Sequence, residues 1–294
     1  MPPKPWSVRD LLKITAAYLK EKAIDSPRLA AEVLLAYQLG IDRVTLYLNF
    51  DQPLTENEVS GYRSLIKRRV RREPLQYITG VQEFWSLDFK VDPRVLIPRP
   101  ETELLIESAI ELLKNLPAPE GQLPKILDLG TGCGAIAISL AKEVEKAEIW
   151  ATDISEEALQ LAQLNAEKHG VSERISFMQG DLWEPLTNQS VVFDIVLSNP
   201  PYIPSEDYNS LSPEIRNYEP RLALDGHEGG MCYIKRILSE APAFISSGGW
   251  IVLEMGPAQT EKALELIEKT KEYEKKSRIK DYSHRYRVVM AQRV

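Results

Sequence analysis

The stretch Ile126-Leu-Asp-Leu-Gly-Thr-Gly-Cys-Gly134 decides the fold of this 294-residue chain. A short run with large apolar side chains leads into three glycines spaced two apart, and a helical pattern follows over 136–144. A strand, a glycine turn and a helix in this order are typical of a ligand site in a doubly wound fold. Gly130 and Gly132 permit a tight turn that approaches a ligand closely, and Gly134 lets helix and strand pack together.

Short apolar runs and helical patterns alternate from residue 124 to the end of the chain. The predicted strands lie at 125–129, 148–153, 175–179, 193–198 and 249–255. The predicted helices between them lie at 136–144, 156–169, 231–245 and 259–270. A closing antiparallel pair at 278–281 and 286–292 makes seven strands. This order predicts an α/β, Rossmann-like fold with a parallel sheet that is covered on both faces.

The first third of the chain reads as helices. Capping boxes begin helices at Ser7-Val-Arg-Asp10 and at Thr55-Glu-Asn-Glu58. Ser26-Pro27 opens another helix, with proline in its first turn, and Gly40 ends it. These signals predict a small helical domain before the sheet.

The helix after Thr55 carries the densest basic run of the sequence, Lys67-Arg-Arg-Val-Arg-Arg72. An apolar stripe of this helix holds Val59, Tyr62, Ile66 and Val70, whereas Arg63, Lys67 and Arg71 fall together elsewhere on it. The basic face has two interpretations: a solvated surface, or a contact for an anionic partner such as RNA or the ribosome.

The pattern changes again after Pro74. Residues 84–97 alternate in polarity and contain Asp92-Pro93, a turn signal, so we expect a β-hairpin there. The sequence is accordingly divided into a helical domain at 1–80, a hairpin linker at 81–97 and the sheet domain at 98–294.

Composition excludes several classes of protein. The chain has 44% apolar and 27% charged residues and a net charge of −7, which argues against a large nucleic-acid footprint. Two cysteines and three histidines exclude a disulfide framework and make a metal site improbable, so none is expected. The sequence has neither a run of ~18 apolar residues nor a signal-peptide pattern, and we expect a cytoplasmic protein without a membrane partner.

Two acidic residues at successive strand ends suggest the ligand. Asp153 ends the second strand and can accept hydrogen bonds from both ribose hydroxyls of an adenosine group. Asp181 follows the third strand and can receive the adenine amino group. The glycine spacing is G-x-G-x-G, shorter than the turn that holds a pyrophosphate, which suits a ligand without phosphate. The pattern indicates S-adenosylmethionine, with S-adenosylhomocysteine as product.

The segment Ser198-Asn-Pro-Pro-Tyr202 is the most specific signal for chemistry. Pro200 and Pro201 lack an N–H and fix φ, so the loop is stiff and presents carbonyls. The Asn199 side-chain oxygen and the Pro200 carbonyl oxygen can hold the two hydrogens of a planar NH₂ group and aim its lone pair at a methyl donor. Tyr202 can pack against the planar group. The target is therefore an exocyclic amine or a carboxamide.

At these residues the chain resembles the HemK-type protein-(glutamine-N5) methyltransferases of class I peptide chain release factors. The Asn-Pro-Pro-Tyr loop is shared with adenine-N6 and guanine-N2 enzymes, so other segments carry the narrower likeness. They are Pro74-Leu-Gln-Tyr-Ile-Thr-Gly80 with Glu83-Phe84, Ile97-Pro-Arg-Pro-Glu-Thr-Glu103, and Glu219-Pro-Arg-Leu-Ala-Leu224. With the helical first third, the resemblance covers nearly the whole chain.

The resemblance implies a release-factor-binding helical domain and methyl transfer to the Gln of the Gly-Gly-Gln loop, which modulates translation termination. It implies that Asn199, Pro200, Pro201 and Tyr202 bind the substrate, with Asn199, Pro200 and Tyr202 as the catalytic set. The implied cofactor-binding residues are Arg99, Glu101, Thr102, Gly130, Thr131, Gly132, Cys133, Gly134, Asp153, Asp181, Leu182 and Asn199.

Two positions depart from the family pattern. Many relatives have Trp directly after the third-strand Asp, whereas here Leu182 precedes Trp183, so either of them can be the adenine contact. His284 stands where the family often has a Gly in the turn before the last strand, and a left-handed conformation there has a steric cost.

Two other functions fit parts of this pattern. An amino-methyltransferase acting on a nucleic-acid base uses the same loop, but would be expected to carry a large basic recognition region. A non-catalytic module that keeps the cofactor fold does not need acceptors aimed at a nucleophile. The sequence therefore favours the protein substrate.

Overall fold

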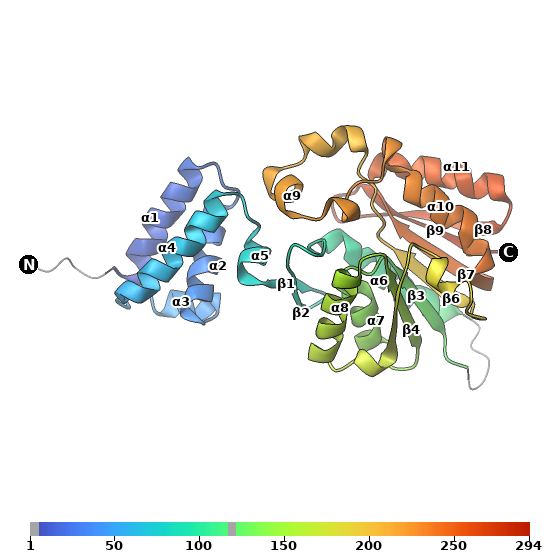
Figure 1. Ribbon diagram of the computed structural model, residues 1–294, viewed down its shortest axis with the longest axis horizontal. Coiled ribbons are helices and arrows are strands. Elements are labelled where there is room, and N and C mark those ends of the chain that lie inside the picture. Colours follow the sequence, from blue (N-terminus) through green and yellow to red (C-terminus); the bar gives the residue numbers. More distant parts are fainter. Residues whose placement is uncertain (1–5, 117–121) are drawn as a thin grey trace, which may run out of the picture. The chain divides into compact units, whose positions relative to one another are not determined.

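The computed structural model describes residues 6–116 and 122–294, and it divides into two compact units (Figure 1). The helical unit is Met1–Val81 with Ser212–Tyr218, and the sheet unit is Gln82–Leu211 with Glu219–Val294. Residues 1–5 of the predicted domain 1–80 and residues 117–121 of the predicted domain 98–294 lie outside the described residues.

The helical unit confirms the helices predicted in the first third. Its helices are α1 (Val8–Glu21), α2 (Pro27–Leu39), α3 (Arg43–Leu48), α4 (Glu56–Val70), α5 (Leu75–Thr79) and α9 (Pro213–Tyr218). Ser7 caps α1 by accepting from the Asp10 N–H at 3.2 Å, and Gly40 ends α2 with φ +65°. Thr55 and Glu58 cap α4 reciprocally, as the capping box predicts.

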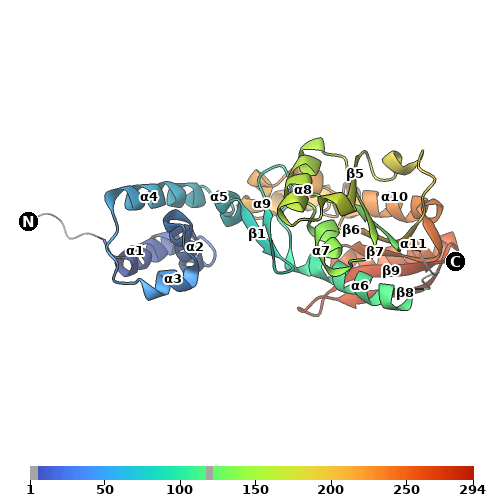
Figure 2. The ribbon, with the colours of Figure 1, turned by 90° about the horizontal axis from the view of Figure 1, so that it is seen from below.

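Helix α2 lies at the centre of this unit, against α1, α3 and α4 (Figure 2). The apolar stripe predicted for α4 packs here: Val59, Tyr62 and Ile66 are buried, and Val70 is partly buried. The Tyr62 hydroxyl donates to the Ala31 carbonyl at 3.0 Å, which fixes α4 to α2. This unit therefore has a core of its own.

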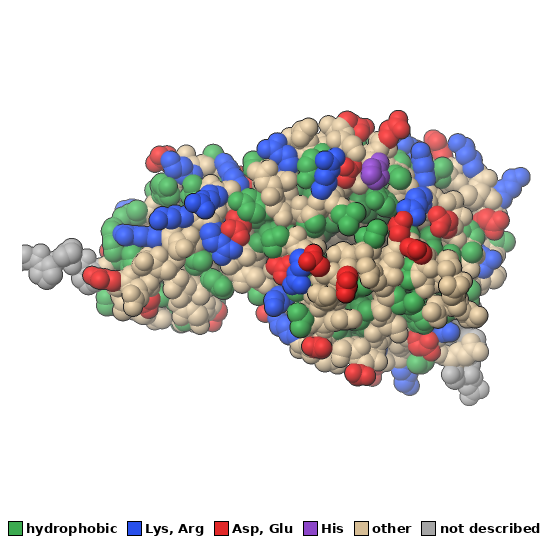
Figure 3. Space-filling view, in the orientation of Figure 1, with side chains coloured by type: hydrophobic (Ala, Val, Ile, Leu, Met, Phe, Trp, Pro, Cys, Tyr) green, Lys and Arg blue, Asp and Glu red, His purple; other side chains and the backbone are tan. Residues whose placement is uncertain are grey.

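Three of the five basic side chains of the run at 67–72 have acidic partners inside the helical unit. Arg68 pairs with Glu73, while Arg69 and Arg72 both pair with Glu214 of α9, at 3.1 and 3.4 Å. Lys67 and Arg71 are exposed, and Figure 3 shows Lys and Arg side chains on this unit. The run therefore offers fewer available cations to an anionic partner than its sequence suggests, because three of its guanidinium groups have partners within the unit.

The hairpin forms earlier in the chain than predicted. Strands β1 (Val81–Phe84) and β2 (Leu87–Lys90) pair around Trp85 and Ser86, and Asp92-Pro93 lies beyond the second strand. Both turn residues have positive φ, +51° and +56°. A two-residue turn of this kind is normally signalled by Asn-Gly or Gly, and neither stands at 85–86. The hairpin therefore lies within the predicted linker 81–97, but its turn precedes the Asp92-Pro93 signal.

The sheet unit contains the predicted seven-stranded sheet, in the order β5-β4-β3-β6-β7-β9-β8. Its strands are β3 (Lys125–Leu129), β4 (Glu148–Asp153), β5 (Ile175–Gln179), β6 (Phe193–Ser198), β7 (Ile245–Glu254), β8 (Tyr273–Lys280) and β9 (Tyr286–Arg293). Strands β3 to β7 are parallel, and β9 is antiparallel to both of its neighbours. The first four strands have the predicted bounds.

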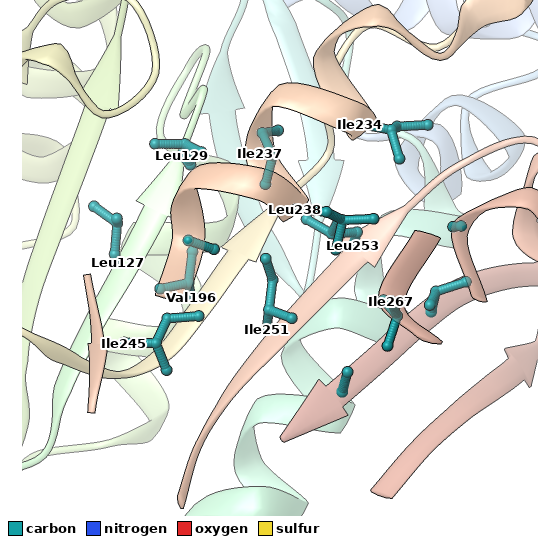
Figure 4. Packing of buried hydrophobic residues seen from close by; sticks show 14 of the residues in the cluster. Leu127, Leu129, Val196, Ile234, Ile237, Leu238, Ile245, Ile251, Leu253 and Ile267 are labelled. Atoms are coloured by element: carbon teal, nitrogen blue, oxygen red, sulfur yellow. The ribbon is translucent and has the colours of Figure 1, made fainter. Parts of the chain in front are cut away.

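Helices cover both faces of this sheet. They are α6 (Glu103–Asn115), α7 (Ala135–Glu143), α8 (Glu156–Lys168), α10 (Cys232–Glu240) and α11 (Thr260–Thr270). Ile237 and Leu238 of α10 pack with Leu127, Val196 and Ile251 on one face (Figure 4). Alternate strand residues point to the opposite face, where α6 and α7 contact the strands.

Short 3₁₀ turns connect these elements: η1 (Pro100–Thr102), η2 (Ser172–Arg174), η3 (Glu184–Leu186), η4 (Ser205–Ser210), η5 (Arg221–Ala223), η6 (Glu228–Gly230), η7 (Ala241–Ala243) and η8 (Pro257–Gln259). The predicted helix 231–245 is too long, because Pro242 cannot continue the α10 hydrogen-bond ladder. Strand β7 begins earlier than residue 249, through a register shift at which Gly248 has φ +78°. His284 takes the left-handed conformation, with φ +60°.

Candidate active site

The glycine turn follows β3 and is tied to the end of β4. The N–H groups of Gly130 and Thr131 donate to the Thr152 carbonyl at 2.8 and 2.9 Å. Gly130 and Gly132 have φ +80° and +57°, which explains glycine at both positions, and a Cβ there would meet open space. Gly134 also has positive φ, +85°, and a Cβ on it would lie 2.7 Å from Ile138 of α7 and 3.2 Å from Ala162 of α8, so its close contacts are with helices and not with the strand that the sequence predicted.

Asp153 ends β4 beside this turn. One carboxylate oxygen accepts the Gly132 N–H at 2.8 Å and the other accepts the Ser155 N–H at 2.9 Å. Burial raises the pKa of Asp153, and the backbone N–H groups oppose that shift. Because each oxygen of a carboxylate has a second lone pair, both can also accept a ligand hydroxyl.

Asp128 lies beneath the turn, and the sequence reasoning gave it no role. It is fully buried, and its Oδ2 accepts the Thr131 hydroxyl at 2.6 Å and the Ala137 N–H at 3.2 Å. Burial raises its pKa to about 7. The sequence did carry a signal of its importance, since Asp128 is an acidic residue in the middle of an apolar strand. Its contacts join the turn to the first residues of α7.

The Asn-Pro-Pro-Tyr loop follows β6 and is fixed from behind. Ser198 donates to the Leu129 carbonyl at 2.6 Å, which joins the end of β6 to the end of β3, directly before the glycine turn. Gln259 Nε2 donates to the Tyr202 carbonyl at 2.7 Å, and a Cβ on Gly230 would lie 2.0 Å from that carbonyl oxygen. A Cβ on Gly226 would lie 2.7 Å from the Pro201 oxygen. The loop is thus held by its neighbours as well as by its prolines.

The side chains of this loop reach two other elements. Asn199 Nδ2 donates to Thr102 Oγ1 at 3.0 Å, and Tyr202 donates its hydroxyl hydrogen to Glu254 Oε1 at 3.2 Å. Thr102 in turn donates to Glu254 Oε2 at 2.6 Å. Sequence reasoning missed Glu254, although a carboxylate that ends the apolar strand Ile251-Val-Leu-Glu254 was a signal of the same kind as Asp153.

Arg99 is held by a buried carboxylate. Its Nη2 donates to Glu219 Oε1 at 2.5 Å, while Glu219 Oε2 accepts the Ile97 N–H at 3.2 Å. The side chain of Glu219 is 2% exposed and that of Arg99 is 30% exposed. Two segments that the sequence analysis singled out, 97–103 and 219–224, therefore meet at the pair of Arg99 and Glu219. The guanidinium group of Arg99 remains partly exposed at this place.

A cavity of about 360 Å³ brings most of the predicted residues together. Its lining includes Arg99, Thr102, Gly130, Thr131, Gly132, Cys133, Asp153, Asp181, Leu182, Asn199 and Pro201. Among the other predicted site residues, it does not include Glu101, Gly134, Pro200 or Tyr202. Residues that the sequence reasoning missed also line it, among them Val95, Ile136 and Tyr233. The volume is in the range of small-molecule sites, roughly 300–1,000 Å³.

Leu182 and Trp183 point to different places. Leu182 lines this cavity, with φ +50°, whereas Trp183 is 1% exposed and stacks on Phe244 with ring centroids 4.8 Å apart. Trp183 instead lines a more open depression of about 920 Å³ that contains neither the glycine turn nor Asn199. Asp181 reaches both hollows, and its Oδ2 pairs with Arg236 at 2.9 Å.

The structure describes residues 6–116 and 122–294. In that part of the chain, no group of three or more His, Cys, Asp or Glu side chains is placed to hold a metal ion. No helix described there has both the length and the apolar character needed to span a bilayer.

Family models match both units of the chain. Residues 10–80 match the PrmC N-terminal domain, and residues 106–215 match the methyltransferase small domain. Solved structures at low identity share the fold: the N-terminal domain of human METTL16 in complex with SAH, at 17% identity, has a TM-score of 0.55 over 88% of this chain and 93% of that chain.

Curated relatives are far more similar and extend over nearly the whole chain. A release factor glutamine methyltransferase of Geobacter sulfurreducens is 45% identical over 268 residues, which cover 91% of this chain and 90% of the relative. A release factor glutamine methyltransferase of Rhodopirellula baltica is 37% identical over 289 residues, covering 98% of this chain and 97% of the relative. On this fold and with this likeness, the protein belongs to the release factor glutamine methyltransferase family.

Proposed function

We propose that this protein transfers a methyl group from S-adenosylmethionine to the side-chain nitrogen of the Gln in the Gly-Gly-Gln loop of bacterial class I release factors. The observation that carries the proposal is the placement of Asn199. It lines the cavity behind the glycine turn, in a loop held by Gln259 and by two glycines. Because the substrate is a translation factor, we assign the reaction to the cytoplasm.

The chemistry of the cavity fits an adenosine-type methyl donor. Open space next to Gly130 and Gly132 lets a ligand approach the backbone, Asp153 offers acceptors for ribose hydroxyls, and Leu182 offers an apolar wall for a base. Arg99, which is 30% exposed although one of its nitrogens pairs with Glu219, offers its remaining N–H donors to a carboxylate at the other end. S-adenosylmethionine, when bound, supplies a methyl group on a positively charged sulfur, and the protein provides position and charge around it.

Asn199 and Pro200 act on the nucleophile. A carboxamide nitrogen is planar and a weak nucleophile, because its lone pair is delocalised into the carbonyl. The Asn199 Oδ1 and the Pro200 carbonyl oxygen would accept its two N–H groups, hold the nitrogen in line with the methyl group and favour a tetrahedral arrangement. Neither group is a strong base, so the gain comes from orientation and electrostatics.

Tyr202 has a different place in this proposal from the one that the sequence suggested. Its hydroxyl donates to Glu254 and its ring packs against the apolar core, so we assign it to the wall behind Asn199. The helical unit would recognise the release factor. We keep the boundaries 1–80, 81–97 and 98–294 as working domain limits, with the family match at 10–80 in their support.

A parallel incubation tests the substrate. The protein and labelled S-adenosylmethionine are incubated in three separate reactions, which contain a release factor, DNA or RNA. The modified residue is then mapped by mass spectrometry. We expect label on the Gln of the Gly-Gly-Gln loop and none on nucleic acid. Label on a base would overturn the proposal. A release factor with Asn in place of that Gln is the matched control, because its shorter side chain cannot reach the loop.

A further inference from the structure

Four side chains from three elements form one hydrogen-bond chain behind the cavity. It runs from Asn199 Nδ2 to Thr102 Oγ1 (3.0 Å), from Thr102 to Glu254 Oε2 (2.6 Å), and from the Tyr202 hydroxyl to Glu254 Oε1 (3.2 Å). Thr102 and Glu254 are 5% and 1% exposed. Asn199 is the member of the chain proposed to touch the substrate, and Thr102 also lines the cavity, at the position that the resemblance assigns to cofactor binding.

The chain has a direction, and an ionised Glu254 sets it. A carboxylate can only accept hydrogen bonds, so Thr102 must give its single hydroxyl hydrogen to Glu254. The Thr102 oxygen is then an acceptor and requires a donor from Asn199. The Asn199 amide must therefore turn its NH₂ end to Thr102, which leaves the Oδ1 end for the cavity.

We propose that Thr102 and Glu254 are positioning residues that fix which end of the Asn199 amide faces the substrate. The inference rests on the proposed function, in which Asn199 Oδ1 accepts from the target carboxamide. With the amide reversed, an NH₂ group would face another NH₂ group, and no hydrogen bond could form. The two ends of an Asn amide have nearly the same shape, so packing alone cannot select one of them.

The cost of burying Glu254 supports a role of this kind. Removing a carboxylate from water is unfavourable unless it is paired and hydrogen-bonded. Burial and, to a smaller degree, Glu101 raise the pKa of Glu254, while Thr102, Tyr202 and Arg287 oppose the shift, and the net pKa is about 7. A protonated Glu254 can donate to Thr102, and Thr102 can then donate to Asn199 Oδ1 and stabilise the reversed amide. Turnover should therefore fall as the pH falls through about 7.

The test compares three variants of the full chain: Thr102→Val, Thr102→Ser and Glu254→Gln. Val has nearly the shape of Thr but no hydroxyl, Ser keeps the hydroxyl, and Gln keeps the shape of Glu but can donate. Turnover of a release factor and KM for S-adenosylmethionine are measured from pH 6 to 9, a range of about 1–2 units around neutrality. The Asn199 side-chain amide is followed by ¹H–¹⁵N NMR and assigned by its loss in Asn199→Asp.

We expect Thr102→Val to lower kcat about tenfold or more, the effect of one misoriented polar contact. Because Thr102 also lines the cavity, KM for S-adenosylmethionine is measured beside kcat and is not expected to stay constant. Thr102→Ser should restore most of the turnover. Glu254→Gln should lower kcat and remove the fall below neutral pH. The Asn199 amide signals should move in Thr102→Val and Glu254→Gln and stay in place in Thr102→Ser.

The positioning role is overturned if Thr102→Val keeps wild-type kcat, or if the Asn199 amide signals do not move. It is also overturned if Glu254→Gln keeps the wild-type pH profile. The proposed function fails separately, if the wild-type protein does not methylate a release factor. In that case the NMR signals still decide the orientation of Asn199, because they need no substrate.

Discussion

Asp153 provides the sharpest test of the proposed cofactor site, through the substitution Asp153→Ala. In the structure its two oxygens already accept the N–H groups of Gly132 and Ser155. If they also accept ribose hydroxyls, the substitution removes charge-assisted hydrogen bonds from the ligand and one anchor from the glycine turn. Both losses weaken binding of the adenosine group.

The expected cost is about 1–3 kcal/mol for the lost charge-assisted bonds. Since each 1.4 kcal/mol is a factor of ten, the dissociation constant should rise about 5- to 140-fold. Burial raises the pKa of Asp153, so protonation begins at a higher pH than for a free aspartate. On acidification, the affinity of the wild-type protein for the adenosine ligand should therefore begin to fall at a higher pH than it would if the carboxylate were exposed.

Calorimetric titration with S-adenosylhomocysteine measures this effect without turnover. Asp153→Asn is the matched variant: it keeps one acceptor for the turn but loses the charge, and should bind between wild type and Asp153→Ala. Thermal unfolding of each variant separates lost binding from lost folding. A dissociation constant for Asp153→Ala within about twofold of wild type, with the fold intact, would refute the assignment of Asp153 to the site.

The remaining predictions concern the loop, the turn and pH. Asn199→Ala should keep S-adenosylhomocysteine binding in calorimetry and lose roughly 100- to 1,000-fold in kcat, as for other preorganised polar contacts; lost binding with unchanged turnover would contradict its role. Gly134→Ala should lower the free energy of unfolding in urea by roughly 1–3 kcal/mol, because a left-handed φ of +85° opposes it and a Cβ would lie 3.2 Å from the Cβ of Ala162, while the end of the Ile138 side chain can move away. Gly170 has φ +70° and open space around a Cβ, so Gly170→Ala should lose only the stability that the left-handed backbone costs. An equal loss of unfolding free energy in the two variants would exclude packing as a reason at Gly134. Because the pKa of Glu254 is raised to about 7, kcat should fall on acidification through that pH, and a flat kcat profile from pH 6 to 8 would count against it.

Local signals in the sequence predicted the elements of the sheet closely. The strands at 125–129, 148–153, 175–179 and 193–198 have the predicted bounds, because each is a short apolar run between polar or glycine-containing turns. The capping boxes predicted helix starts for a similar reason, since the hydrogen bonds involved join residues three apart. The hairpin was predicted, but the place of its turn was not, because Trp85 and Ser86 adopt positive φ without the residues that normally signal such a turn.

The sequence by itself determined the glycine turn, the strand-end acids and the Asn-Pro-Pro-Tyr loop, because each depends on the chemistry of a few adjacent residues. Only the tertiary structure decided which distant groups complete the site. The chain from Asn199 through Thr102 to Glu254 joins residues 97 and 152 positions apart, and Arg69 finds Glu214 across 145 positions. Such partners meet because strands and helices pack side by side in space, and no local spacing encodes which of many carboxylates will be buried beside a given hydroxyl or guanidinium group.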